Sequence, residues 1–264
     1  MIEVFLVKII FFCYLFQAVA ADVGDSYDTT CVCAETSPNG AFCSAFKCQS
    51  NQITHCFSSN STVEIKSTKE YKSMNELKIG DEILVNINKH GQRIYEPIYS
   101  FIHANPNGTY EYLKISVENN LQRSLIISSN HLIYRYNGIN PIFAGHLKIG
   151  DQLQVISNDG SSIQAGSIIN IKLIKSQGYY APLTPCGRLI VDGIIVSNYA
   201  TVANHQLAHL AMQPYRWWVQ WIGSSSYSES IHFYCQCLYF IVEYINKWFF
   251  PIGLYDGVLT ITNF

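Results

Sequence analysis

Charged residues are scarce in this sequence, and neither sign dominates. Lysine, arginine, aspartate and glutamate together account for 14% of the 264 residues, and the formal net charge is -2. The lysines and arginines are scattered along the chain without forming a basic cluster. Proteins that bind nucleic acid depend on such a cluster to attract the phosphate backbone. The composition therefore argues against a nucleic-acid partner.

The two cysteines near the C-terminal end of the sequence make a poor zinc-binding pair. A structural zinc site usually takes two such pairs with short spacers between the partners. Cys235 and Cys237 are two positions apart on an expected helix, where their side chains would point to different faces. Cys186, in a Thr-Pro-Cys-Gly segment, is expected to be an exposed turn residue rather than a catalyst. We expect neither a metal nor a cofactor.

The apolar run near the N-terminus, residues 9–16, is shorter than the ~20 residues that a membrane-spanning helix needs. It is followed by Ala-Val-Ala at positions 18–20, which fits the small-residue pattern of signal-peptide cleavage. We therefore predict a secretory signal at residues 1–20, with a membrane anchor as the alternative. The protein would then be secreted and extracellular, with processing in the secretory pathway.

Four cysteines crowd the segment that follows, residues 21–55. They are Cys31, Cys33, Cys43 and Cys48. Cysteines of a secreted chain form disulfides in an oxidising compartment, and four cysteines allow three pairings between which the sequence does not choose. A segment this short cannot bury a sizeable core unaided. We expect a small cysteine-rich secreted peptide that is stapled by disulfides.

A repeated unit dominates the middle of the chain. Leu-Lys-Ile-Gly-Asp at positions 77–81 recurs at positions 147–151, and residues 127–131 have a weaker counterpart at residues 195–199. Short segments rich in β-branched and aromatic residues surround both units, separated by turn signals such as Pro-Asn-Gly at positions 106–108. The pattern predicts an all-β domain built from two related halves, with Asp81 and Asp151 as turn-forming residues.

The pattern of apolar residues changes from strand-like to helix-like near residue 201. Residues 201–213 show helical spacing of apolar side chains, and we expect Pro214 to end that helix. In residues 231–249 the apolar positions form one helical stripe, with polar residues elsewhere. These polar groups make a membrane span unfavourable. The sequence predicts an amphipathic C-terminal tail that is able to contact a membrane surface.

The junction around Cys56 has the composition of a self-cleavage site. A thiol can attack the carbonyl of the residue before it, here His55, and convert the amide into a thioester. The departing amide nitrogen then needs a proton, which a nearby histidine can supply. His131, which follows Ser-Ser-Asn between two apolar segments, is the candidate. The alternative is a structural cysteine and a hydrogen-bonded histidine at a strand end.

The wider pattern resembles the autoprocessing region of Hedgehog proteins, the Hedgehog/intein (Hint) module. The resemblance rests on the order and spacing of short motifs: Cys-Phe-Ser at 56–58, the repeated unit at 77–81, Ser128-x-x-His131, Tyr-Ala-Pro-Leu-Thr at 180–184 and Ile-Val-Asp-Gly at 190–193. The short cysteine-rich front is more similar to nematode Hedgehog-related proteins than to the Hedgehog signalling domain. The resemblance implies an all-β Hint module with a pseudo-two-fold repeat, followed by a helical tail.

The resemblance also implies residue roles. Cys56 matches the nucleophile, and His131 matches the histidine that works on the scissile amide. Ser128 stands where the family usually has threonine, whose hydroxyl polarises the same bond. His103 occupies the position of an aspartate that activates the sterol hydroxyl in well-known members, and histidine can act as a base near neutral pH. For His103 the alternative is a loop histidine without this role.

Further positions depart from the family pattern. His55 precedes the nucleophile where the family usually has glycine, and its side chain is expected to narrow access to the scissile carbonyl. Asn198 replaces the cysteine of a Ser-Cys-Tyr-Ala segment, so any role of that thiol is absent. The same segment lacks the His-Asn pair with which splicing members end, which argues against protein splicing.

The sequence thus predicts a secreted precursor that cuts itself between His55 and Cys56, in a single-turnover, cysteine-dependent reaction. Its parts would be a signal peptide (1–20), a cysteine-rich peptide (21–55), a Hint domain (56–213) and an acceptor-binding tail (214–264). The released peptide would carry a sterol or another lipid acceptor and could bind a cell-surface receptor. The alternatives are the same cleavage with water as the acceptor, and a non-catalytic secreted Hint module.

Overall fold

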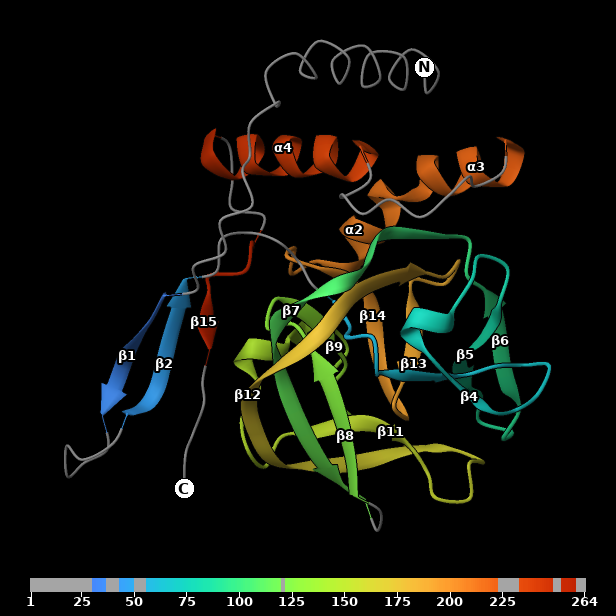
Figure 1. The fold of residues 1–264 in the computed structure, drawn as a ribbon, viewed down its shortest axis with the longest axis horizontal. Coiled ribbons are helices and arrows are strands. Elements are labelled where there is room, and N and C mark those ends of the chain that lie inside the picture. Colours follow the sequence, from blue (N-terminus) through green and yellow to red (C-terminus); the bar gives the residue numbers. More distant parts are fainter. Residues whose placement is uncertain are drawn as a thin grey trace.

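A computed structural model describes residues 30–36, 43–49, 56–119, 122–222, 233–248 and 253–259 (Figure 1). The expected secretory signal at residues 1–20 and the residue before the expected cleavage point, His55, lie outside the described residues. The β-module begins at Cys56, so only the C-terminal side of the expected scissile bond is among the described residues.

Most of the described elements are strands, as the sequence predicts. The strands are β1 (Thr30–Thr36), β2 (Cys43–Gln49), β3 (Thr62–Glu64), β4 (Tyr71–Ser73), β5 (Glu82–Ile87), β6 (Arg93–Pro97), β7 (Ser100–Glu118), β8 (Gln122–Ile127), β9 (His131–Ile133), β10 (Ile142–Phe143), β11 (Gln152–Ile156), β12 (Ile163–Leu183), β13 (Arg188–Val191), β14 (Ile194–Ala200) and β15 (Val258–Leu259). The helices are α2 (His205–Ala211), α3 (Gln213–Ile222) and α4 (Phe233–Trp248), with short 3₁₀ turns η1 (Met74–Glu76) and η2 (Ala144–His146).

One large antiparallel sheet forms the body of the molecule. Its strand order is β10-β9-β14-β11-β12-β7-β8, and β13 pairs with β14 at the side. Two hairpins, β3-β4 and β5-β6, complete the β-module. The fold is therefore all-β, and within the described residues the α-helices lie in the C-terminal part (Figure 1).

The repeated unit folds the same way in both halves. Gly80 and Gly150 each adopt a φ of +92°, a conformation that glycine tolerates far better than other residues. The Gly80 N–H donates to the Ile98 carbonyl at 2.8 Å, and the Gly150 N–H donates to the Ile168 carbonyl at the same distance. A 3₁₀ turn, η1 or η2, precedes each unit. The pseudo-two-fold repeat read from the sequence is thus present in the backbone.

The two aspartates of the repeat close these turns. The Asp81 carboxylate accepts the Lys78 N–H at 2.8 Å, and the Asp151 carboxylate accepts the Lys148 N–H at 2.9 Å. Each side chain therefore caps its own turn, which is the usual role of aspartate in this position. Their prediction as turn formers is confirmed.

Two long strands, β7 and β12, run side by side through the module (Figure 1). The sequence predicts a turn at Pro-Asn-Gly, residues 106–108, and this prediction is wrong. The pairing continues on both sides, from Asn105 with Tyr179 to Thr109 with Gln177, so the three residues form an outward bulge opposite Gly178. Gly178 has a φ of +63°, and extra backbone is accommodated there without ending the strand.

The interior of the β-module is filled by one main cluster. It includes Phe57, Leu77, Ile115, Ile127 and Leu147, each at most 1% exposed. Leu77 and Leu147 occupy equivalent positions of the repeat, so both halves contribute the same type of side chain to one core. Its fully buried members all lie between residues 56 and 196.

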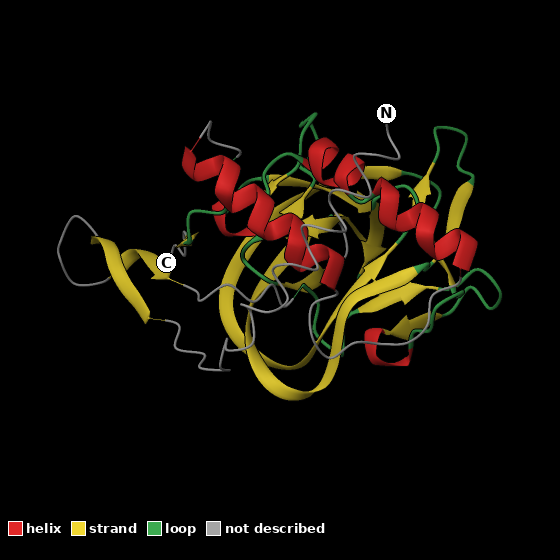
Figure 2. Cartoon of the chain, turned by 90° about the horizontal axis from the view of Figure 1, so that it is seen from above, coloured by secondary structure: helices red, strands yellow, loops and turns green. Residues whose placement is uncertain are grey.

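The helices lie together on one side of the β-module (Figures 1 and 2). The expected end of the helix at Pro214 is wrong: α2 ends at Ala211, and α3 begins at Gln213 with Pro214 in its first turn. Proline is tolerated there because its missing N–H would have no partner inside the helix. Within the described residues, no helix has the length and apolar character needed to cross a membrane.

A second cluster joins these helices to the sheet. Tyr99, Leu132 and Leu183 from the module pack against Met212 and Tyr215. Helix α4 adds half-buried side chains near its start to the same cluster, including Leu238. The amphipathic stripe predicted for the tail is thus partly used for packing on the module.

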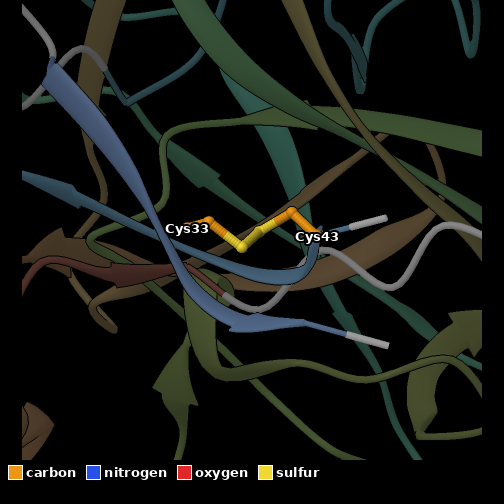
Figure 3. The surroundings of a disulfide bond; sticks show 2 residues. All are labelled: Cys33 and Cys43. Carbon is orange, nitrogen blue, oxygen red and sulfur yellow. A yellow bond between two sulfur atoms is a disulfide. The ribbon is translucent and has the colours of Figure 1, made fainter. Parts of the chain in front are cut away.

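A small sheet in the order β1-β2-β15 joins the N-terminal hairpin to the C-terminal end of the described chain. A disulfide between Cys33 and Cys43 links β1 to β2 (Figure 3). Cys237 is also disulfide-bonded, while Cys235 is a free thiol. The different states of these neighbours agree with their placement on different helix faces.

Candidate functional site

Cys56 begins the β-module in a strained backbone conformation. Its φ is +49°, a region that non-glycine residues rarely occupy. The next residue, Phe57, is fixed by two backbone hydrogen bonds with Tyr180, of 3.1 and 2.9 Å. The Cys56 carbonyl accepts the Ser128 N–H at 3.0 Å. Strain of this kind is kept only where the surrounding structure enforces it, and it is frequent at reactive sites.

His131 lies beside this junction, fully buried at the start of β9. Its Nε2 is 2.7 Å from the Ser197 carbonyl oxygen, which can only accept, so Nε2 carries the proton. The neutral ring therefore has its lone pair on Nδ1, for which no hydrogen-bond partner exists among the described residues. The ring of Phe57 packs against the imidazole, with centroids 4.6 Å apart.

Ser128 completes the group through both its backbone and its side chain. Its N–H binds the Cys56 carbonyl, and its own carbonyl accepts the His131 N–H at 3.1 Å. The buried hydroxyl has no hydrogen-bond partner within the described part of the chain. The sequence predicts that Cys56, Ser128 and His131 act together, and the fold brings these three residues to one place.

Burial sets the charge state of both reactive groups. Removal from water raises the pKa of the Cys56 thiol and lowers the pKa of His131 to about 4, although the hydrogen bond to Ser197 opposes the second effect. At neutral pH the site therefore holds a protonated thiol and an uncharged imidazole. A thiol in this state needs a base to remove its proton as it attacks.

His103 lies in β7 and is only 2% exposed. The loop position expected in the alternative is therefore wrong, while the role of His103 stays a prediction. Its ring meets the edge of the Tyr179 ring at a centroid distance of 5.0 Å. The next residue, Ala104, pairs with Tyr180, which is itself bridged to Cys56. The pairing of Ala104 with Tyr180 thus places β7 beside the partner of Cys56, and His103 is the residue before Ala104.

Asn198 is a buried structural residue. Its amide nitrogen donates to the Thr184 carbonyl at 3.0 Å and to the Thr184 hydroxyl at 3.2 Å. Cys186 belongs to the turn after Thr184, as expected, but the expectation that it is exposed is wrong. It is half-buried, and its backbone N–H donates to the Glu96 carboxylate at 2.7 Å.

Two contributors to the site were not predicted from the sequence. The Ser197 carbonyl fixes the tautomer of His131, and the Tyr180 backbone binds the backbone of Phe57, the residue after Cys56. The weaker internal repeat was a usable signal for the first, because residues 127–131 and 195–199 are its two copies and His131 binds Ser197 across them. In the described ranges, no group of three or more histidine, cysteine or acidic residues is arranged to hold a metal.

Comparison with known proteins agrees with this arrangement. A family model described as the Hint module matches residues 44–247, more than three quarters of the chain. The Tiggy-winkle hedgehog protein of Danio rerio is 27% identical over 215 residues, which cover 75% of this chain and 51% of that protein. Warthog protein 8 of Caenorhabditis elegans is 26% identical over 167 residues, which cover 59% of this chain and 29% of that protein.

Solved structures of inteins also match. A DnaB intein from Synechocystis is 16% identical, with a TM-score of 0.44, and the match covers 56% of this chain and 99% of the intein. The chain spans about half the length of the hedgehog proteins that it matches. The family match leads to one conclusion: the chain belongs to the Hint family, and its module is similar to the corresponding region of hedgehog proteins.

Proposed function

We propose that this chain cuts itself between His55 and Cys56 and transfers the N-terminal peptide to a lipid acceptor. The observation that carries the proposal is the convergence of Cys56, Ser128 and His131 in a buried site. There the Nδ1 atom of His131 and the hydroxyl of Ser128 have no hydrogen-bond partners among the described residues. Buried polar atoms are normally paired, and a catalytic role is one explanation for those that are not.

The first step exchanges an amide for a thioester. The Cys56 thiol gives its proton to Nδ1 of His131, and the sulfur attacks the His55 carbonyl carbon. The C–N bond then breaks, and the same proton passes from Nδ1 to the departing Cys56 nitrogen. The neutral His131 expected at pH 7 is the form that can accept the first proton, and the Ser128 hydroxyl is available to donate to the carbonyl oxygen.

The second step transfers the peptide from sulfur to an acceptor. An acceptor hydroxyl loses its proton to a base and attacks the thioester carbonyl, and the Cys56 thiol is regenerated. His103 is proposed as this base, because β7 places it beside the strand pair that holds the Cys56 junction. Histidine is the side chain used most often as a base near neutral pH.

The acceptor is proposed to be a sterol or another lipid. Helices α3 and α4 leave several aromatic side chains exposed: Trp217, Trp218, Trp221, Phe240, Tyr244 and Trp248. Tryptophan and tyrosine are favoured where an apolar phase meets water, so this face is suited to a membrane surface or to a lipid taken from it. Secretion of the chain, and binding of the released peptide to a cell-surface receptor, complete the proposal.

Mass spectrometry of the cleaved protein tests both steps. The proposal requires a C-terminal fragment that begins at Cys56 and an N-terminal peptide whose mass exceeds that of its free acid by one lipid alcohol minus water. A peptide with the mass of the free acid would show that water is the acceptor. An intact chain with no fragment under any condition would identify a non-catalytic Hint module.

A further inference from the structure

A cavity lies away from the cleavage site, between helix α2, the start of α3 and the sheet. Its volume is about 540 Å³, within the range of small-molecule sites. Cys56, Ser128 and His131 do not line it. The cavity is therefore a separate feature of the fold, and the proposed cleavage reaction makes no use of it.

The lining of this cavity is basic. It includes Arg188, Arg216, His205 and His209, and no aspartate or glutamate is among the lining residues. Within the described part of the chain, neither arginine forms an ion pair with a carboxylate. Arginines that face one cavity without an acidic partner are unusual, because the positive charges repel each other and lose hydration.

The basic side chains are held in place by neighbouring groups. Nη1 of Arg216 donates to the His209 carbonyl at 3.0 Å, and Nδ1 of His209 lies 2.8 Å from the Tyr199 hydroxyl. The Arg188 guanidinium lies over the Tyr134 ring, 5.4 Å from its centroid. This fixed geometry lowers the entropy that a ligand would lose by ordering flexible side chains.

The positive charges around the two histidines of the cavity disfavour protonation of either ring. Burial, the charge of His209 and the charge of Arg188 lower the pKa of His205 to about 4. The pKa of His209 is lowered by burial and by both arginines. No aspartate or glutamate of the described residues lines the cavity, and the Glu96 carboxylate beside the lining residue Cys186 accepts the backbone N–H of Cys186. The positive field of the cavity is thus left without a compensating anion.

We propose that this cavity binds a phosphate group carried by a small organic ligand. Planar guanidinium groups bind phosphate oxygens through paired hydrogen bonds, and Arg188 and Arg216 supply two such groups. The cavity is larger than one phosphate, and its edge includes the exposed apolar residues Ile139 and Leu210. The rest of the ligand would lie against these residues.

The test is an NMR titration of the full 264-residue chain, which carries Cys56→Ala to keep it intact, with inorganic phosphate at constant ionic strength. The ring signals of His205 and His209 should shift and saturate, because an anion beside them changes their electrostatic surroundings. Arg188→Gln should weaken this binding by about ten- to hundredfold, since it removes a charge-assisted contact. Arg188 is the preferred position because its side chain forms no hydrogen bond with other described residues, so the substitution breaks none. Arg216→Gln is the second variant.

Lys172→Gln is the matched control, because it removes one exposed positive charge of β12 that does not line the cavity. It should bind phosphate like the unmodified protein. Equal shifts in the Arg188 variant and the control, or shifts that never saturate, would overturn the proposal.

Competition by vesicles that contain phosphatidic acid, but not by pure phosphatidylcholine vesicles, would identify a lipid headgroup as the source of the phosphate. Phosphate binding without such competition would identify a soluble phosphorylated ligand.

Discussion

The reactive side chains owe their properties to burial rather than to nearby charges. Cys56 and His131 are at most 2% exposed, and desolvation is the main cause of both pKa changes. A buried thiol that stays protonated does not react with solutes at random. It becomes a nucleophile only when His131 accepts its proton.

His131 and His103 should fail in different ways when they are replaced. In the proposed reaction, His131→Ala blocks thioester formation and should slow cleavage by dithiothreitol by about 10²–10⁴-fold. His103→Ala should leave cleavage by dithiothreitol unchanged and abolish only the transfer to lipid. Gel analysis of the two variants with dithiothreitol, and with lipid vesicles, measures both steps. If the variants lose the same step, the division of roles is wrong.

His131 should also make the folded state sensitive to acid. Its pKa is about 4 in the folded protein, against 6.5 when unperturbed, so the unfolded chain binds a proton first as the pH falls. Stability is therefore complete above about pH 6.5 and decreases down to about pH 4, by about 3 kcal/mol from this residue.

Urea unfolding at both ends of this pH range measures the effect in a Cys56→Ala background, which prevents cleavage. The additional change His131→Gln should flatten the pH dependence by about 3 kcal/mol. His205, whose pKa is also lowered, is present in both proteins, so its contribution cancels. Parallel pH profiles would mean that His131 is charged or accessible in the folded state.

The sequence predicts the reactive side chains of the site but not the backbone groups that hold them in place. Cys56, Ser128 and His131 were found because each belongs to a short motif with a recognisable order. The roles of Ser197 and Tyr180 depend on backbone atoms, which every residue has, and so leave no trace in residue identity. Residue 55 was also identified, but its geometry lies outside the described residues.

The repeated turn is the element that sets the architecture of the two halves. Gly80 and Gly150 have the same φ, and a Cβ atom at either position would meet nothing within 4 Å. Any cost of alanine at these positions therefore comes from the backbone conformation alone. That cost is about 1–2 kcal/mol for a residue forced into positive φ.

Gly80→Ala and Gly150→Ala should thus each reduce the free energy of unfolding by about 1–2 kcal/mol, and by similar amounts. Urea unfolding in the Cys56→Ala background provides the measurement. Gly138→Ala is the comparison, because Gly138 is not among the residues with positive φ; its added Cβ would lie 3.3 Å from the Arg135 Cβ, so any loss there reports a side-chain contact and not the backbone conformation. Clearly unequal losses at the two repeat positions would contradict their structural equivalence.

Elements defined by local turn chemistry were predictable, and elements defined by tertiary pairing were not. The turns at residues 80–81 and 150–151 follow from Gly-Asp alone. The continuous strand β7 crosses a Pro-Asn-Gly segment because its partner β12 continues on both sides of the bulge. Helix α3 was missed because Pro214 was read as an end, whereas it stands in the first turn.

At the scale of the whole molecule, the core of the β-module is separate from the packing of the helices. The main cluster is complete within the module, while α3 and α4 pack on a second cluster around Tyr99 and Tyr215. The cleavage residues belong to the first cluster or lie beside it. The exposed aromatic face belongs to the helices.

Removal of residues 224–264 should therefore separate cleavage from lipid transfer. The shortened protein is expected to fold, to be cleaved by dithiothreitol at an unchanged rate, and to attach no lipid. Circular dichroism and mass spectrometry provide the measurements. A shortened protein that still yields lipid-modified peptide would exclude α4 from acceptor binding. An insoluble product would show that the second cluster is required for folding.

The central claim is that the Cys56 sulfur cuts the chain at its own N-terminal side, and one comparison tests it most directly. Purified wild-type, Cys56→Ala and Cys186→Ala proteins are incubated with dithiothreitol, and the fragment masses are measured. Cys186 is the control because it is another free cysteine, outside the proposed site. We predict a fragment that begins at Cys56 from the wild type and from Cys186→Ala, and none from Cys56→Ala. Equal cleavage of the Cys56→Ala protein would contradict the account.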